Sequence, residues 1–361
     1  MRDAQPTILV LGSTISKLVW IDQAKKIADL GFRTIFFVRK KVSDSPENSR
    51  VKTVEVPNNI FCHWLRFFKV LKSSRPHHIE AFHDLYRWDF LLSYWIYVWL
   101  AKIFRIPIVS VCMGGEILYW EKHFFLKKWS IKTLLRASKH IIVKEPYHRE
   151  YIEKYKILGK KKINIVEIPN ATDIREEFDV KRKEDIVLYL NSFKTWRHPE
   201  VVVQAFKLIK KKIPDALLIM AGYRTEEELA RIRESMDSET APSIRYIPYD
   251  FENRKLFSQA KIFLLPAELV YVNNSLLEAM ERGVPPVIGN VDPYGEKIVR
   301  NGENGFAVDI TPEAVAEKSV LLLENEDLRQ KLGRNARDTV TRHFNNRIRI
   351  QSLLELYKSL E

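Results

Sequence analysis

The chain has 361 residues, of which 46% are hydrophobic and 11% aromatic, and this apolar content excludes a chain that is mainly disordered. Two cysteines, Cys62 and Cys112, are too few for a disulfide scaffold, and the lack of a Cys/His cluster argues against a structural zinc site. The net charge is +13, and at about 150 residues per domain the length predicts two domains.

Strand-like apolar runs alternate with segments of helical periodicity along the whole chain. In the first half we predict strands at residues 8–11, 33–38, 78–82, 108–112 and 139–143, with helices at 17–30 and 88–104. After residues 169–173 the pattern restarts, with strands at 186–190, 216–221, 243–247, 262–265 and 286–288 and helices at 200–212, 274–282 and 312–324. Such alternation predicts an α/β protein of two doubly wound, Rossmann-like domains that face a central cleft.

The start of the chain and its longest apolar run indicate the cellular compartment of the protein. Residues 1–5 are polar and lead directly into a strand-like run, which is not the pattern of a secretory signal. The longest uncharged apolar run, residues 90–101, has twelve residues, whereas a membrane-spanning helix needs about 20. We therefore expect a cytoplasmic protein.

All of the excess positive charge lies in the first half. Residues 1–168 hold 30 Lys and Arg against 15 Asp and Glu, whereas residues 169–361 hold 29 against 31. Residues 64–72 and 123–129 interleave cations with aromatic residues, which predicts amphipathic helices on an anionic membrane surface, here the inner face. A solvated basic face over an aromatic-rich core remains an alternative. Nucleic acid binding would also need such residues, but no nucleic-acid motif is present, so we expect no nucleic acid partner.

Residues 266–289, PAELVYVNNSLLEAMERGVPPVIG, predict a loop that opens into a helix and is followed by a buried strand. The backbone N–H groups of Asn274, Ser275 and Leu276 would form the helix N-terminus, which is a site for an anion. Glu278 lies one turn further along, where its carboxylate can accept hydrogen bonds from the hydroxyl groups of a ribose.

This segment resembles the retaining glycosyltransferases of family 4, the glycosyl transferases group 1, which have the GT-B fold. Four further segments resemble motifs of that family in the same order: IVSVCMGGE at 108–116, IVEIPNATD at 165–173, LIMAG at 218–222 and NGENG at 301–305. The resemblance implies an acceptor-binding domain at 1–168, a nucleotide-sugar-binding domain at 169–343, and a C-terminal helix at 344–361 that crosses back to the first domain.

The family also implies roles for individual residues. Its catalytic and diphosphate-binding positions correspond to Arg197, Lys194 and Glu278. The donor contacts correspond to Asn274, Ser275, Leu276, Glu268 and Gly222, and the acceptor contacts to Gly12, Ser13, Asp84, Gly114 and Glu116. These enzymes usually need no metal because a basic pair stabilises the departing diphosphate, so we expect no metal and no cofactor beyond the nucleotide sugar.

Four positions depart from the family pattern. Ser192 stands where the family has an Arg, and Lys194 is the nearby cation that could replace it. Val270 stands where the first Glu of the E-x7-E motif is usual, and Glu268 is two residues early. Met113 stands where a His is frequent, and the loop that begins at residue 12 has one Gly where the family often has two.

These departures leave two main hypotheses. In the first, the protein is a retaining, metal-independent glycosyltransferase of the hexosyltransferase type, which moves a sugar from a nucleotide diphosphate sugar to a lipid-linked or glycan acceptor at the membrane surface. In the second, it is a degenerate homologue that binds nucleotide, acceptor or a partner enzyme without turnover. A sugar epimerase of the same fold is a third, weaker reading of the pattern.

Overall fold

The computed structural model describes residues 6–11, 26–38, 50–56, 59–82, 88–112, 117, 120–176, 184–222, 224–248 and 251–360. The chain divides into two compact units. Unit 1 comprises Met1–Pro169 together with Ile350–Glu361, and unit 2 comprises Asn170–Arg349.

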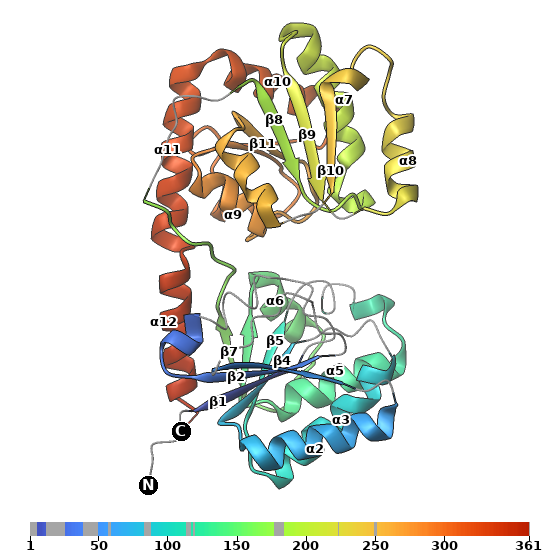
Figure 1. Cartoon of the computed structure of the whole chain (residues 1–361), viewed down its shortest axis with the longest axis vertical. Helices are drawn as coiled ribbons and strands as arrows, with labels where there is room; N and C mark the ends of the chain where they lie inside the picture. Colours follow the sequence, from blue (N-terminus) through green and yellow to red (C-terminus); the bar gives the residue numbers. More distant parts are fainter. Residues whose placement is uncertain are drawn as a thin grey trace. The chain divides into compact units, whose positions relative to one another are not determined.

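Unit 1 is built on a parallel sheet of seven strands in the order β3-β2-β1-β4-β5-β6-β7 (Figure 1). The strands are β1 (Thr7–Leu11), β2 (Arg33–Val38), β3 (Val51–Glu55), β4 (His78–Phe82), β5 (Ile108–Cys112), β6 (His140–Val143) and β7 (Asn164–Glu167). Strands such as β1 and β5 are apolar along almost their whole length because helices cover both faces of the sheet.

Two apolar cores flank this sheet. One contains buried side chains of α2 (Ile60–Ser74), α3 (Trp88–Ile103), α5 (Phe125–Ala137) and α6 (Pro146–Lys154). The other contains the helical residues 26–29 and the end of α12 (Asn346–Lys358). The chain terminus is held there by polar contacts as well, because the Tyr357 hydroxyl donates to the buried Glu80 carboxylate and Lys139 Nζ donates to the Leu360 carbonyl at 2.8 Å.

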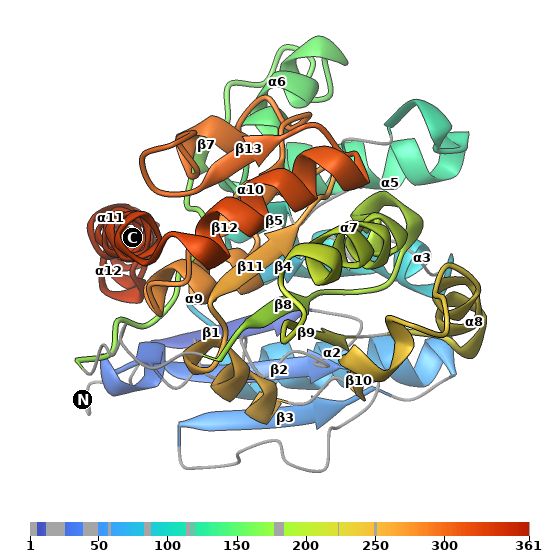
Figure 2. The ribbon, with the colours of Figure 1, turned by 90° about the horizontal axis from the view of Figure 1, so that it is seen from above.

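Unit 2 repeats the architecture with six parallel strands in the order β10-β9-β8-β11-β12-β13. They are β8 (Ile186–Leu190), β9 (Leu217–Gly222), β10 (Ile244–Pro248), β11 (Ile262–Leu265), β12 (Pro286–Gly289) and β13 (Phe306–Val308). One face is covered by α7 (Pro199–Lys212), α8 (Glu226–Glu234) and α10 (Pro312–Glu324), and α7 and α10 lie side by side in Figure 2. The opposite face is covered by α9 (Asn274–Glu281) and α11 (Glu326–His343).

The second face depends on one close backbone approach. A Cβ atom at Gly333 in α11 would lie 2.3 Å from the carbonyl oxygen of Gly283, just after α9. Only glycine allows the two helices to pack this closely, and so α11 covers α9 and the sheet edge beneath it.

Each sheet has a topological switch point. The chain enters each sheet at a central strand, runs to one edge, and then returns to the other side of the first strand, so the switch lies between β1 and β4 in unit 1 and between β8 and β11 in unit 2. In doubly wound folds, ligands bind outside the carboxyl ends of the strands at this position. The predicted α/β class with two Rossmann-like sheets is thus confirmed.

Candidate functional site

The switch point of unit 2 is formed by two loops. One follows β8 and spans residues 191–198, and the other follows β11 and spans residues 266–273. Both leave the carboxyl ends of adjacent strands, so they meet at one edge of the sheet. The sequence predictions Arg197, Lys194 and Glu268 all fall on these two loops.

Three contacts join the loops. The Glu268 N–H donates to the Trp196 carbonyl at 3.2 Å, and the Arg197 guanidinium donates to the Leu269 carbonyl at 2.5 Å. The Glu268 carboxylate also lies 3.3 Å from His198 Nε2. The Arg197 guanidinium is positioned further by the Trp196 ring, whose centroid is 4.0 Å away, as expected for a cation–π pair. Arg197 is therefore held at the junction of the loops.

Lys194 and Ser192 occupy the same loop in different ways. Lys194 is exposed and immediately precedes the short 3-10 turn η2 (Thr195–Arg197), which ends in Arg197. The Ser192 backbone is fixed by hydrogen bonds, because its N–H donates to Asn191 Oδ1 at 2.8 Å and its carbonyl accepts from the Tyr189 hydroxyl at 2.7 Å. Lys194 is thus the cation nearest in sequence to Arg197 on this loop.

Gly222 ends β9 beside the same loop. A Cβ atom at this position would lie 1.7 Å from the Asn191 carbonyl oxygen, and the φ angle of 156° is one that residues with side chains rarely adopt. The close approach of β9 to the loop after β8 therefore requires glycine.

The N-terminus of α9 follows the second loop. The Asn273 side chain caps the helix by accepting from the Leu276 N–H at 3.2 Å. The cap therefore occupies one of the three amides that the sequence assigned to an anion, while Asn274 and Ser275 lie ahead of it in the first turn.

Asp292 was not singled out from the sequence, although it organises the second loop. Its buried carboxylate accepts from the Val270 N–H at 2.8 Å and the Tyr271 N–H at 2.9 Å through Oδ2, and from the Tyr294 N–H at 2.9 Å through Oδ1. The signal available in the sequence was an acidic residue shortly after a predicted buried strand, at the carboxyl edge of the sheet.

Val270, at the family's carboxylate position, has its side chain fully buried in the core of unit 2. The only glutamate on this loop is Glu268, whose side chain is 53% exposed and faces His198. The loop thus presents its carboxylate two residues before the position that the family pattern would use.

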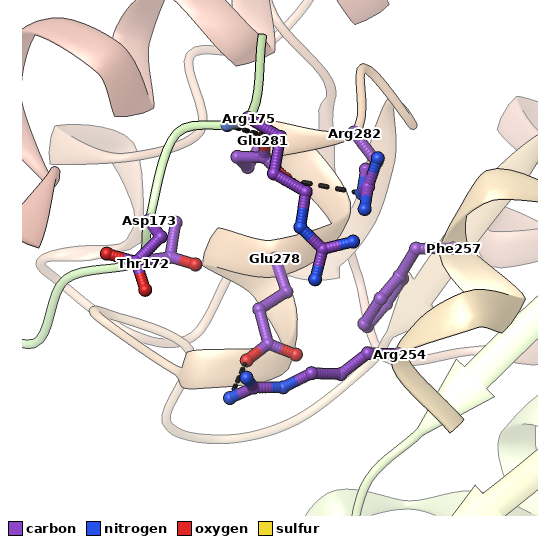
Figure 3. A pocket seen from close by; sticks show the side chains of 8 residues that line it. All are labelled: Thr172, Asp173, Arg175, Arg254, Phe257, Glu278, Glu281 and Arg282. Atoms are coloured by element: carbon purple, nitrogen blue, oxygen red, sulfur yellow. Dashed lines mark hydrogen bonds and ion pairs between the residues drawn. The ribbon is translucent and has the colours of Figure 1, made fainter. Parts of the chain in front are cut away.

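Glu278 lines a small pocket in unit 2 with a volume of about 80 Å³ (Figure 3). The other lining residues are Thr172, Asp173, Arg175, Arg254, Phe257, Glu281 and Arg282. Arg254 comes from η4 (Phe251–Ser258), and its Nη2 lies 2.6 Å from Glu278 Oε1. Figure 3 shows the Arg175 guanidinium pointing into the same pocket. The sequence predicted Glu278 but none of these neighbours.

The electrostatics of this pocket are mixed. Burial raises the pKa of Glu278 to about 7, although Arg254 and Arg175 oppose the shift. Burial also raises the pKa of Glu281, whose Oε1 accepts the Arg175 N–H at 2.9 Å and so fixes the segment that carries Arg175. Glu278 is therefore a hydrogen-bond acceptor that gains or loses its negative charge near neutral pH.

The acceptor-side predictions Gly12, Ser13, Asp84, Gly114 and Glu116 lie outside the described residues, as does Met113. In the sequence these residues come directly after β1, β4 and β5, which are neighbours in the first sheet. Their attachment points are thus at one edge of that sheet, next to its switch point.

Residues 170–339 match the family model Glycosyl transferases group 1. This segment is a glycosyl transferases group 1 domain. The resemblance to the glycosyl transferases group 1 is thereby confirmed for the segment that carries Arg197, Gly222 and Glu278.

Relatives of the chain are glycosyltransferases of several specificities. It is 24% identical to N-acetyl-alpha-D-glucosaminyl L-malate synthase of Bacillus anthracis over 53% of this chain and 49% of that protein. It is also 24% identical to trehalose synthase of Thermococcus litoralis over 75% of this chain and 71% of that protein. The chain thus spans about half the length of the first relative.

Solved structures match over nearly the whole chain. Sucrose-phosphate synthase from Thermosynechococcus elongatus matches with a TM-score of 0.78 at 17% identity, covering 98% of this chain and 99% of that one. Anabaena HepE in complex with UDP and glucose matches with a TM-score of 0.77 at 15% identity, covering 98% and 100%. At such identities the likeness concerns the fold, and that fold is GT-B.

Proposed function

We propose that the protein is a retaining glycosyltransferase that transfers a sugar from a nucleotide diphosphate sugar to a lipid-linked or glycan acceptor. The observation that carries this proposal is the gathering of Arg197, the α9 N-terminus and Gly222 around the switch point of a glycosyl transferases group 1 domain. The similarity to the structure of HepE with UDP and glucose supports a nucleotide sugar as donor.

In this proposal the donor lies against unit 2. Glu278 accepts hydrogen bonds from the ribose hydroxyls, and the amides of Asn274 and Ser275 face the diphosphate. Arg197 and Lys194 stabilise the negative charge that grows on the diphosphate as the glycosidic bond breaks. Gly222 allows the backbone to approach the ligand closely. The two cations take the part that a metal ion plays elsewhere, so we propose that no metal or further cofactor is needed.

The configuration of the anomeric carbon is retained if the acceptor hydroxyl attacks the face of the sugar from which the diphosphate departs. The bond from the anomeric carbon to the phosphate oxygen breaks, the bond to the acceptor oxygen forms, and the departing phosphate takes the acceptor's proton. No protein nucleophile is required, which is compatible with a buried Val270 at the family's carboxylate position.

For the acceptor we propose a molecule held at an anionic membrane by unit 1, with the enzyme peripheral on the cytoplasmic face. The excess of 15 positive charges in residues 1–168 supports this, because such a field attracts anionic headgroups and diphosphate lipids. None of the helices in the described ranges has the length and hydrophobicity needed to cross a bilayer.

Nucleotide release from a panel of nucleotide diphosphate sugars tests the donor site. Arg197→Ala should lower kcat/KM by about a hundredfold or more, the usual effect of removing one group that stabilises a developing charge. Arg300→Ala, which removes an exposed guanidinium paired with Glu303, is the matched control and should leave turnover unchanged. An Arg197→Ala protein that turns over like wild type would remove the assigned donor site.

The second candidate function is binding without turnover, and one observation favours it: the carboxylate expected at position 270 is replaced by a buried apolar side chain. It predicts that a nucleotide raises the melting temperature while no donor yields free nucleotide. Thermal shift and nucleotide release on the same panel therefore separate the two functions.

A further inference from the structure

Large apolar side chains on the surface are concentrated in one place. Among the described residues, thirteen large hydrophobic side chains are exposed, and nine of them lie on α2, on α3 or at residues 124–129. We call this set the aromatic patch: Phe61, Leu65, Phe68, Trp99, Ile103, Phe124, Phe125, Leu126 and Trp129. It contains all six exposed aromatic residues of that group, and contiguous exposed apolar surface of this kind marks an interaction site.

The helix periodicity shows that these residues are not part of the core. On α2, Phe61, Leu65 and Phe68 follow the i, i+4, i+7 spacing of one stripe. The buried residues of the helix, His63, Phe67 and Leu71, form a separate stripe. The helix therefore has two apolar stripes, of which only one is covered by the sheet.

The helices α3 and α5 continue the same surface. On α3, Trp99 and Ile103 are one turn apart and 60% and 55% exposed, whereas Tyr97 and Ala101 are buried. On α5, Phe125 is 75% exposed, while Ile131 and Leu135 are buried. Each of the three helices thus directs one side into the core of unit 1 and leaves large apolar groups on its outer side.

Contacts between the helices make these outer sides contiguous. Trp64 Nε1 of α2 donates to Ser93 Oγ of α3 at 3.3 Å, and the Phe68 ring lies 5.6 Å from that of Phe104. Trp95 Nε1 of α3 donates to Ser130 Oγ of α5 at 3.2 Å. Figure 1 shows α2, α3 and α5 packed beside one another on one side of the first sheet.

Basic side chains lie on the same helices as the aromatic patch. Exposed or half-exposed basic side chains on the same helices and beside their ends include Arg66, Lys69, Lys72, Arg75, Lys102, Arg105, Lys122, Lys128, Lys132 and Arg136. The one carboxylate among the described side chains of α2, α3 and residues 120–132 is that of Glu121, which accepts from the Tyr155 hydroxyl at 2.8 Å. The surface therefore combines large exposed apolar side chains with an excess of basic ones.

We propose that the aromatic patch docks on an anionic lipid bilayer, with its aromatic side chains in the interface and its cations on the headgroups. This deepens the proposed function by assigning its membrane contact to a particular surface. Aromatic residues favour the interfacial region, and Lys and Arg can bury their aliphatic stems while their charged ends reach the headgroups. A second copy of this chain would fit poorly, because the basic side chains of the two copies would face one another, and Glu121 is the one carboxylate among the described side chains of this surface.

Vesicle flotation with the full chain tests the proposal. Binding to phosphatidylcholine vesicles that contain phosphatidylglycerol should exceed binding to pure phosphatidylcholine vesicles and should decrease as salt is added, without vanishing, because apolar insertion is not screened. Phe61→Ser/Phe125→Ser and Lys69→Glu/Lys102→Glu should each weaken binding by about tenfold or more. These four side chains are exposed, and circular dichroism checks that the variants remain folded.

Matched controls are available on unit 2. Val291→Ser/Leu321→Ser removes two exposed apolar side chains, and Lys211→Glu/Lys212→Glu reverses two exposed charges on α7. Both should bind vesicles as wild type does. If patch and control variants bind equally, or if neutral and anionic vesicles bind equally, the proposal is wrong. A dimer in sedimentation that the patch variants dissociate would assign the surface to a second copy and overturn it too.

Brominated lipids give a direct measure of insertion. They should quench tryptophan fluorescence in wild type, and less so in Trp99→Phe at equal bound fraction. Nucleotide release without vesicles should be the same in all these variants. The patch variants leave unit 2 unchanged, and the control variants lie in unit 2 but outside its donor site. Vesicle binding by a protein that turns over no donor would therefore refute the proposed transferase activity and leave the docking surface standing. Turnover by a protein that binds no vesicles would refute the docking surface and the membrane location, and would leave the donor site standing.

Discussion

The raised pKa of Glu278 gives the sharpest prediction about stability. Its pKa is about 7 in the folded protein and 4.5 in its ordinary state, so between these values the folded protein holds a proton that the unfolded chain has released. Stability contributed by this group is therefore present at low pH and is lost as pH rises through 4.5 to 7. From these two values, wild type should lose about 2.5 kcal/mol relative to Glu278→Gln between pH 5 and pH 8.

Scanning calorimetry at the two pH values measures this loss. For a unit of this size, 1 kcal/mol corresponds to about 2–4 °C, so the melting temperature of wild type relative to Glu278→Gln should decrease by roughly 5–10 °C from pH 5 to pH 8. Arg254→Gln removes the cation 2.6 Å from Glu278 and should enlarge the loss. Glu317→Gln, on an exposed glutamate of α10, is the control and should follow wild type.

Parallel melting curves for wild type and Glu278→Gln across this range would refute the reasoning, because they would mean that Glu278 has the same proton affinity in both states. A functional consequence follows from the same pKa. About half of the Glu278 side chains carry a proton at pH 7, so the donor KM should decrease as pH rises from 7 to 8.

Two further substitutions test the scaffold of the site. Gly222→Ala would place Cβ 1.7 Å from the Asn191 carbonyl oxygen and should lower the free energy of unfolding in urea by at least about 3 kcal/mol. Gly302→Ala, at a φ of 75° in open space, is the control and should lower it by about 1–2 kcal/mol. Equal losses in the two variants would contradict the steric account. Asp292→Asn weakens three charge-assisted hydrogen bonds, so it should lower the free energy of unfolding by about 1–3 kcal/mol and raise the donor KM. The Asp309 carboxylate accepts one hydrogen bond from Asn290, so Asp309→Asn should change both quantities less. An unchanged donor KM in Asp292→Asn would show that this loop does not contribute to donor binding.

The sequence by itself determined most of the central structure. The strands β2, β4, β5, β8 and β11 were predicted at their observed bounds. Strands β8 and β11 are uninterrupted apolar runs, as expected of strands covered on both faces, and the other three are mainly apolar. Helices such as α3, α7 and α10 were predicted within a residue. For α7 and α10 the periodicity and the Pro or Thr start signals are local features of the sequence.

The strands that the sequence missed, β3, β7 and β13, all lie at the edge of a sheet. They are short and partly polar, as in VKTVE and NIVE, and are extended because each pairs with one neighbouring strand. Their conformation is set by that partner, and nothing in the segments themselves encodes it.

The residues of the candidate site likewise divide into those that sequence motifs located and those that only the fold brought together. Motifs located Arg197, Gly222 and Glu278, because a loop, a strand end and a helix start are local features of the sequence. Only the tertiary structure brought Arg254 to Glu278, Asp292 to the Val270 amide, and the helices that carry the aromatic patch to one another. The physical reason is that ion pairs, burial and pKa depend on distances between segments that are far apart along the chain, and those distances exist only once the chain has folded.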